Sequence, residues 1–107
     1  MISGESNCGR ETEVLVDVDL EEIMPEIVEG WKSEIDTMVK ALGINDYETI
    51  RKLGHSMKGT GGACGFDFVS RMGRELEDGA RRREAEVIQR TLDMLAAFLG
   101  QVEIVYE

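Results

Sequence analysis

The single histidine of this chain, His55, lies in a glycine-rich stretch, LGHSMKGTGGACG. A neutral imidazole is a good nucleophile near physiological pH, so His55 is the first candidate for chemistry. Arg51 and Lys58 lie one helical turn before and after it. Residues 49–66 contain no Asp or Glu, although the chain carries 22 acidic residues. The sequence therefore predicts a small basic surface around one nucleophile.

The apolar positions of the same segment place His55 on the outside of a helix. At about 100° per residue, they define a core direction from which His55 is turned by roughly 150°. A lone histidine is often a hydrogen-bonded core residue, and this periodicity argues against that explanation. An ordinary surface histidine stays open as an alternative. The core-facing positions are Ile50, Leu53, Gly54, Met57, Gly61 and Cys64.

Two glycines, Gly59 and Gly62, fall beside His55 on the outward face. Glycine at an exposed helical position costs about 1 kcal/mol relative to alanine, so a pair on one face suggests the close approach of something large. The simpler explanation is that the glycines end the helix. It accounts for Gly61, Gly62 and Gly65, which are expected to loosen the chain there, but it does not account for Gly59.

Other chemistries fit this stretch less well. A phosphate-binding loop of the G-x-x-x-x-G-K-[ST] type is not matched, because Lys58 precedes its glycine and no strand comes before it. The G-x-G-x-x-G pattern fails because residue 64 is cysteine. A structural zinc site needs about four ligands, which one histidine and two distant cysteines cannot supply. Cys64 lies on the core side, which argues against a Cys–His pair, and no metal site is expected.

Apolar residues at three- and four-residue steps predict a helical chain. Pro25 suits the first turn of a helix and Gly43 suits a helix end. Asn45 is the expected N-cap of the next helix, with Glu48 three residues later. The predicted helices run over about residues 19–24, from Pro25 to Gly43, from Asn45 onward, from Phe66 to Ala80 and from Glu84 to Val102.

The length of 107 residues allows one domain with one core. We expect a flexible tail over residues 1–12 and a single helical domain over residues 13–107. EVLVDVD is interpreted as an extended lead-in and EIVYE as a frayed helix end. One proline and few aromatic residues favour helix over a sandwich or barrel. Short loops predict an all-α fold, an antiparallel up-down-up-down four-helix bundle with a short extra N-terminal helix.

The charge of the chain argues against several classes of partner. A net charge of −10 repels nucleic-acid phosphates and anionic lipid, so neither is expected to bind. No apolar run approaches the roughly 18 residues of a membrane span, and the first residues lack the regions of a secretory signal. Cys8 and Cys64 are far apart in unlike contexts, which favours a reduced, cytoplasmic protein without a disulfide.

The stretch HSMKGTGGACG fits the pattern H-x-[hydrophobic]-K-G-x-x-x-x-x-G from His55 to Gly65. It closely resembles the histidine phosphotransfer (HPt) domains of bacterial two-component phosphorelays. The resemblance extends to the order of the helices and covers about residues 17–105. Thr60-Gly61-Gly62 is richer in glycine than a typical member, which bears on the rigidity of this turn and not on the chemistry. The other segments that carry the resemblance are DLEEIMPEIVEGWKSEIDTMVKAL, DYETIRKLGHSMKG and GFDFVSRMGRELE.

The resemblance implies a four-helix bundle whose exposed histidine is reversibly phosphorylated. His55 would carry the phosphoryl group, Lys58 would neutralise its charge, and Gly59 would leave room for the partner. The implied partners are a response-regulator receiver domain, a sensor histidine kinase or both. The receiver would bring its own Mg²⁺, and this chain would need no cofactor. The remaining residues expected in docking and in the turn are Arg51, Gly62 and Gly65.

No nucleotide-binding motif is present, so the chain is expected to pass phosphoryl groups, as a monomeric carrier and not as an enzyme that uses ATP. The alternative is a helical docking module that binds a kinase or receiver without carrying phosphate. His55 and Lys58 together favour transfer. A phosphohistidine-dependent phosphatase is disfavoured because no second catalytic group lies near His55. Arg74 and Arg81, on the following helix, are candidates to extend the basic surface.

Overall fold

The chain forms four α-helices and a small two-stranded sheet. The computed structural model describes residues 13–107, so the predicted tail over residues 1–12 lies outside the described residues. The elements are, in chain order, β1 (Glu13–Val16), the 3-10 helix η1 (Val18–Leu20), α2 (Met24–Gly43), α3 (Tyr47–Ala63), α4 (Asp67–Arg81), α5 (Ala85–Gln101) and β2 (Glu103–Tyr106).

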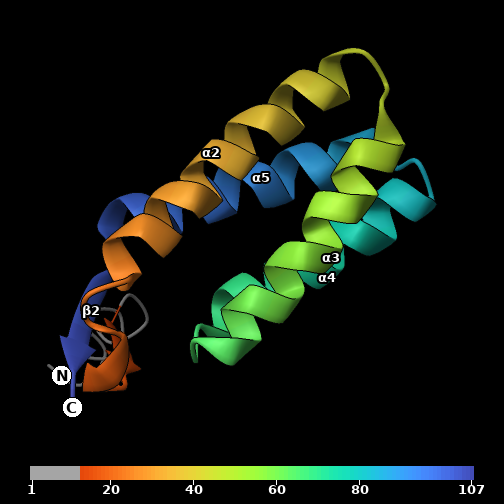
Figure 1. The fold of residues 1–107 in the computed structure, drawn as a ribbon. Helices are drawn as coiled ribbons and strands as arrows, with labels where there is room; N and C mark the ends of the chain where they lie inside the picture. The colour runs from red at the N-terminus through yellow and green to blue at the C-terminus, as the bar shows by residue number, and fades with distance from the viewer. Residues whose placement is uncertain (1–12) are drawn as a thin grey trace, which may run out of the picture.

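The four helices form a bundle in which each contacts the next along the chain and α5 also contacts α2 (Figure 1). The α3–α4 pair has the most extensive contact. The predicted helical content and the predicted number of long helices are therefore confirmed. Within residues 13–107, no helix combines the length and the apolar character that crossing a bilayer would require.

The segment before α2 contains less helix than expected. Only η1 and a following turn occupy the place of the predicted first helix, and the backbone hydrogen bonds within this segment each span three residues. The side chain of Asp17 accepts the N–H of Asp19 and caps this turn. Pro25 lies in the first turn of α2, where its missing N–H costs nothing.

The N-cap of α3 is Asp46 and not Asn45, which corrects the prediction by one residue. Asp46 Oδ1 accepts the Thr49 N–H at 3.2 Å, and Oδ2 accepts the Thr49 hydroxyl at 2.6 Å. Asn45 instead has φ 60°, a left-handed conformation that asparagine tolerates better than most residues. The turn from α2 therefore uses Asn45, and the cap falls to the next residue. Glu48 pairs with Arg51 and does not complete a capping box.

The glycines at the end of α3 do not loosen it, contrary to expectation. The helix continues through Gly61 and Gly62 to Ala63, and the chain turns at Gly65, which has φ 83°. A Cβ added to Gly61 would lie 2.8 Å from the backbone nitrogen of Ser70 in α4. Gly61 therefore permits close contact between two helices.

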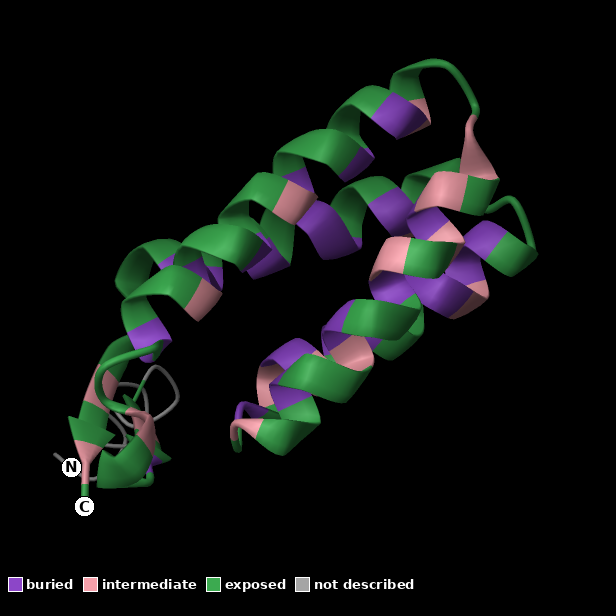
Figure 2. Cartoon of the chain, in the orientation of Figure 1, coloured by how far each residue is buried: buried purple, intermediate pink, exposed green. Residues whose placement is uncertain are grey.

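The core lies between the four helices, along the inward-facing buried positions of Figure 2. Trp31 of α2 packs edge-on against Phe66, with ring centroids 5.0 Å apart. Its indole N–H donates to Thr60 Oγ1 at 3.0 Å, so the polar atom of this buried ring is satisfied. Met94 of α5 lies outside this core and is 46% exposed.

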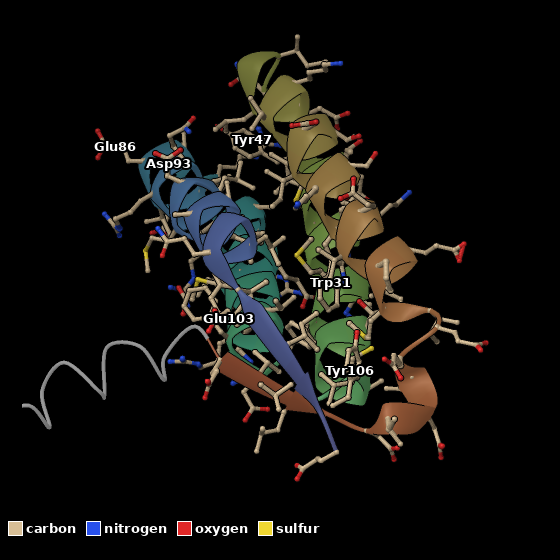
Figure 3. All side chains as sticks on the ribbon, turned by 90° about the vertical axis from the view of Figure 1, so that its left-hand side faces the viewer. Trp31, Tyr47, Glu86, Asp93, Glu103 and Tyr106 are labelled. Carbon is tan, nitrogen blue, oxygen red and sulfur yellow. The ribbon has the colours of Figure 1, made fainter. Side chains whose placement is uncertain are left out.

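The two ends of the described chain pair as parallel strands, which an all-α prediction does not include. Glu13 lies opposite Glu103 and Leu15 opposite Val105. The extended lead-in is thus confirmed over Glu13–Val16 but not beyond, because Val18–Leu20 form η1, and the expected fraying of EIVYE is wrong. Figure 3 shows β2 continuing directly from α5. Ile104 and Val105 are β-branched and suit a strand, and Ile104 and Tyr106, on one face, pack against the core.

Candidate functional site

His55 projects from the middle of α3 into solvent. Its side chain is 65% exposed, so the orientation predicted from the helical period is confirmed. Lys58 follows one turn later on the side of α3 that faces α4, with 34% of its side chain exposed. The two side chains belong to one helix, and α4 supplies the group that joins them.

That group is Glu77, a carboxylate whose side chain is only 9% exposed. Its Oε2 lies 3.1 Å from His55 Nδ1 and its Oε1 lies 3.2 Å from Lys58 Nζ. Arg81 Nη2 lies 3.3 Å from the same Oε2. The prediction of a basic surface without acids is therefore wrong for the folded chain, because α4 places the carboxylate of Glu77 at the centre of that surface.

The sequence carries a signal for Glu77 that the pattern of α3 alone does not include. Gly73, Leu76 and Ala80 are small or apolar residues at three- and four-residue steps, and all are buried. Glu77 lies within this stripe, where a charged residue is rare unless it is paired. A carboxylate on a buried stripe next to a helix with an exposed nucleophile is thus a candidate site residue.

Electrostatics keep Glu77 ionised. Burial raises the pKa of its carboxyl group, but hydrogen bonds from Lys58 and His55 outweigh this effect, and the pKa lies below the ordinary value. An ionised carboxylate only accepts hydrogen bonds. The proton of a neutral His55 is therefore on Nδ1, which donates to Glu77 Oε2. The lone pair of the imidazole is on Nε2, the other ring nitrogen.

Glycine contacts between α3 and α4 set the short distances of this site. Cβ atoms added to Gly54 and Gly73 would lie 2.8 Å from Glu77 N and 2.5 Å from Lys58 N, respectively. Neither position has room for a side chain, so the two backbones pack directly against each other. Ser70 Oγ donates to the carbonyl oxygen of Lys58 at 2.9 Å and ties the same turn to α4.

Comparison with known protein families identifies the family of the chain. The model of the Hpt domain matches residues 18–101, most of the chain. The chain belongs to the Hpt domain family. Hpt domains are histidine phosphotransfer modules of phosphorelays, and they act as phosphocarriers that interact with kinases and receiver domains. No curated protein and no solved structure matches this chain.

The other residues singled out in the sequence lie around His55 in different settings. Apart from Gly59 itself, its two chain neighbours and the nearby backbone of α3, no atom of residues 13–107 lies within 4 Å of a Cβ added to Gly59, so the surface there is open. A Cβ on Gly62 would touch Ser70 Oγ at 3.6 Å. Gly65, in the α3–α4 turn, takes the positive φ that the turn requires.

The basic residues near His55 are partly neutralised by acids. Arg51 Nη2 lies 2.7 Å from Glu48 Oε2, and this hydrogen bond raises the pKa of Arg51. Arg81 is part of the site, through Glu77, while Arg74 is exposed and forms no ion pair within the described part of the chain. The described residues contain no group of three or more histidine, cysteine, aspartate or glutamate side chains that could hold a metal ion.

Proposed function

We propose that His55 accepts a phosphoryl group on Nε2 and passes it between the aspartates of receiver domains, or from a sensor histidine kinase, in a bacterial two-component phosphorelay. One observation carries this proposal. An exposed imidazole is held through Nδ1 by a buried, ionised carboxylate, so that Nε2 retains the lone pair. Such a group is an oriented nucleophile that a partner protein can reach.

The transfer step uses this orientation. The Nε2 lone pair of His55 attacks the phosphorus atom of a partner aspartyl phosphate in line with the leaving oxygen. A P–N bond forms, the P–O bond to aspartate breaks, and the aspartate leaves as a carboxylate. Because Nδ1 keeps its proton, the ring gains a positive charge, which the Glu77 carboxylate at 3.1 Å stabilises. The reverse step returns the phosphoryl group to an aspartate.

Lys58 supports the transfer through its charge. Its ammonium group lies one helical turn from His55 and is partly exposed, so it can reach an oxygen of the phosphoryl group. A local cation also favours the docking of an acidic receiver active site on a chain of net charge −10. The Mg²⁺ of the reaction belongs to that receiver, and this chain contributes no cofactor.

Gly59 gives the partner room to approach. An alanine there would be a better helix former by about 1 kcal/mol, and the open surface offers no packing reason for glycine. Gly62 and Arg51 lie on the same side of α3 and extend the docking surface, and Gly65 serves the turn that follows it. The absence of a side chain lets the loops of a receiver come within reach of His55 Nε2.

The wider proposal is a monomeric, cytoplasmic phosphocarrier without turnover of its own. Residues 13–107 form its single domain, an antiparallel up-down-up-down bundle. Short connections of three residues between consecutive helices support the antiparallel arrangement.

Incubation with phosphorylated receiver domains tests the proposal. The chain should acquire a label that is labile in acid and stable in base, and His55→Gln should not, at unchanged helical content. Arg90→Gln, an exposed arginine on α5, is the control and should be labelled at the original rate. A labelled His55→Gln protein, or binding of receivers without any label, would overturn the proposal, and the second result would favour a docking module.

A further inference from the structure

Arg81, in the last turn of α4, contacts the same carboxylate oxygen that faces His55. Its Nη2 lies 3.3 Å from Glu77 Oε2, and His55 Nδ1 lies 3.1 Å from that oxygen. Its Nη1 lies 3.2 Å from Asp78 Oδ1. The planar guanidinium group is therefore fixed between two carboxylates of its own helix.

Lys58 cannot neutralise both Glu77 and a phosphoryl group to the same extent. In the free protein its ammonium group lies 3.2 Å from Glu77 Oε1. A phosphoryl group on His55 adds up to about two negative charges and strong acceptor oxygens beside it. The ammonium group is then drawn outward, and Glu77 loses one of its two cations at the moment when the imidazole ring becomes positive.

We propose that Arg81 is a positioning residue, which keeps the Glu77 carboxylate against His55 Nδ1 while Lys58 serves the phosphoryl group; this inference rests on the proposed function. Arg81 reaches Oε2 and Lys58 reaches Oε1, so the departure of Lys58 leaves the contact of Arg81 intact. Asp78 holds the other end of the guanidinium group and prevents Arg81 from following Lys58 toward the phosphoryl oxygens.

A purely structural role for Arg81 predicts a different result. A cation in the last turn of a helix stabilises that helix end. The side chain of Arg81 is 58% exposed, and ion pairs of this kind contribute little to the stability of the fold. A loss of stability alone would not change which nitrogen of His55 carries the proton. The tautomer of His55 therefore separates positioning from stabilisation.

The first experiment measures the ratio of the Nδ1–H to the Nε2–H form of His55 by ¹⁵N NMR, above the pH at which the ring is protonated. Lys58→Met imitates the departure of the lysine. In that background, Arg81→Gln should lower the ratio at least threefold, toward the value of Glu77→Ala, whereas Arg81→Lys should retain most of it. Arg90→Gln in the same background is the charge-matched control and should leave the ratio unchanged. A smaller change in the double variant would overturn the inference.

The second experiment measures the lifetime of phosphohistidine after loading with phosphoramidate, a small donor that needs no protein partner. Arg81→Gln should change the half-life at least threefold at unchanged helical content, and Arg81→Lys should restore most of it. An unchanged half-life would also overturn the inference. If the original protein takes no phosphoryl group from any donor, the proposed function fails, while the tautomer ratio, which needs no phosphate, still decides whether Arg81 positions Glu77.

Discussion

Replacing Gly73 with alanine is expected to disturb the candidate site around His55 without changing any of its side chains. An added Cβ would lie 2.5 Å from Lys58 N, 2.8 Å from Gly54 O and 2.9 Å from Lys58 Cα. All three are backbone atoms of α3, so no flexible side chain can give way. Restoring ordinary van der Waals contact requires α3 and α4 to separate by about 1 Å.

Two opposing effects decide the stability of Gly73→Ala. Alanine is the better helix former by about 1 kcal/mol, while overpacking costs about 1–3 kcal/mol. Because the obstructing atoms are backbone, we expect the second effect to win and the free energy of unfolding to fall by up to about 2 kcal/mol. The same separation would lengthen the contacts of Glu77 with His55 and Lys58, now 3.1 and 3.2 Å, beyond hydrogen-bonding range.

Urea unfolding and the ¹⁵N spectrum of His55 test both consequences on one sample. Gly30→Ala is the matched control, because Gly30 lies within α2 and no atom of the described residues falls within 4 Å of its added Cβ. It should gain up to about 1 kcal/mol from helix propensity. If Gly73→Ala gained stability in the same way and kept the Nδ1–H tautomer, the glycine contact would not set the geometry of the site, and the reasoning would be refuted.

Three further predictions concern the site itself. Lys58→Ala should slow transfer from a receiver and alter the phosphohistidine lifetime without unfolding the bundle; unchanged kinetics would make it an ordinary surface charge. Gly59→Gln should raise stability by up to about 1 kcal/mol but slow transfer, and melting and transfer on one sample decide this. Glu77→Gln should lower the free energy of unfolding by about 1–2 kcal/mol at pH 7. The folded-state pKa of Glu77 lies below the ordinary 4.5, so the difference in unfolding free energy between the original protein and Glu77→Gln should be complete above pH 4.5 and shrink as the pH falls below it. A difference that does not depend on pH would contradict the role of the carboxylate.

The exposed histidine could be predicted from the sequence because it depends only on local geometry. Ile50, Gly54, Met57 and Gly61 recur at three- and four-residue steps, and all are buried in α3, so the outward direction of His55 follows from the helical period. The motif around His55 adds the family, which the Hpt domain model confirms over residues 18–101. Both inferences need one segment of chain and no tertiary contact.

The partner of that histidine could not be predicted in the same way. Glu77 follows His55 by 22 residues, and their contact depends on the rotation and spacing of two helices. That spacing depends on Gly54, Gly61 and Gly73, whose roles become visible only when the facing backbone is in place. A glycine in a sequence can mark either the end of a helix or a close contact between two helix backbones, and the local pattern favours the first interpretation. The same limit applies to β2, because its four residues gain their hydrogen bonds from β1, at the other end of the described chain.

In the proposed transfer, the buried carboxylate would let one surface serve both states of His55. Before transfer, the charges of Lys58 and Arg81 are balanced by those of Glu77 and Asp78, so the four groups together carry no net charge. After transfer, the ring becomes positive beside Glu77, and the phosphoryl group offers a new acceptor to Lys58. Each new charge thus has an opposite charge already in position, which lowers the reorganisation that the step requires. A cluster of cations without Glu77 would attract the phosphoryl group more strongly, but it would oppose the positive charge on the ring. It would also leave the proton of His55 free to occupy Nε2, which is the nitrogen that must attack.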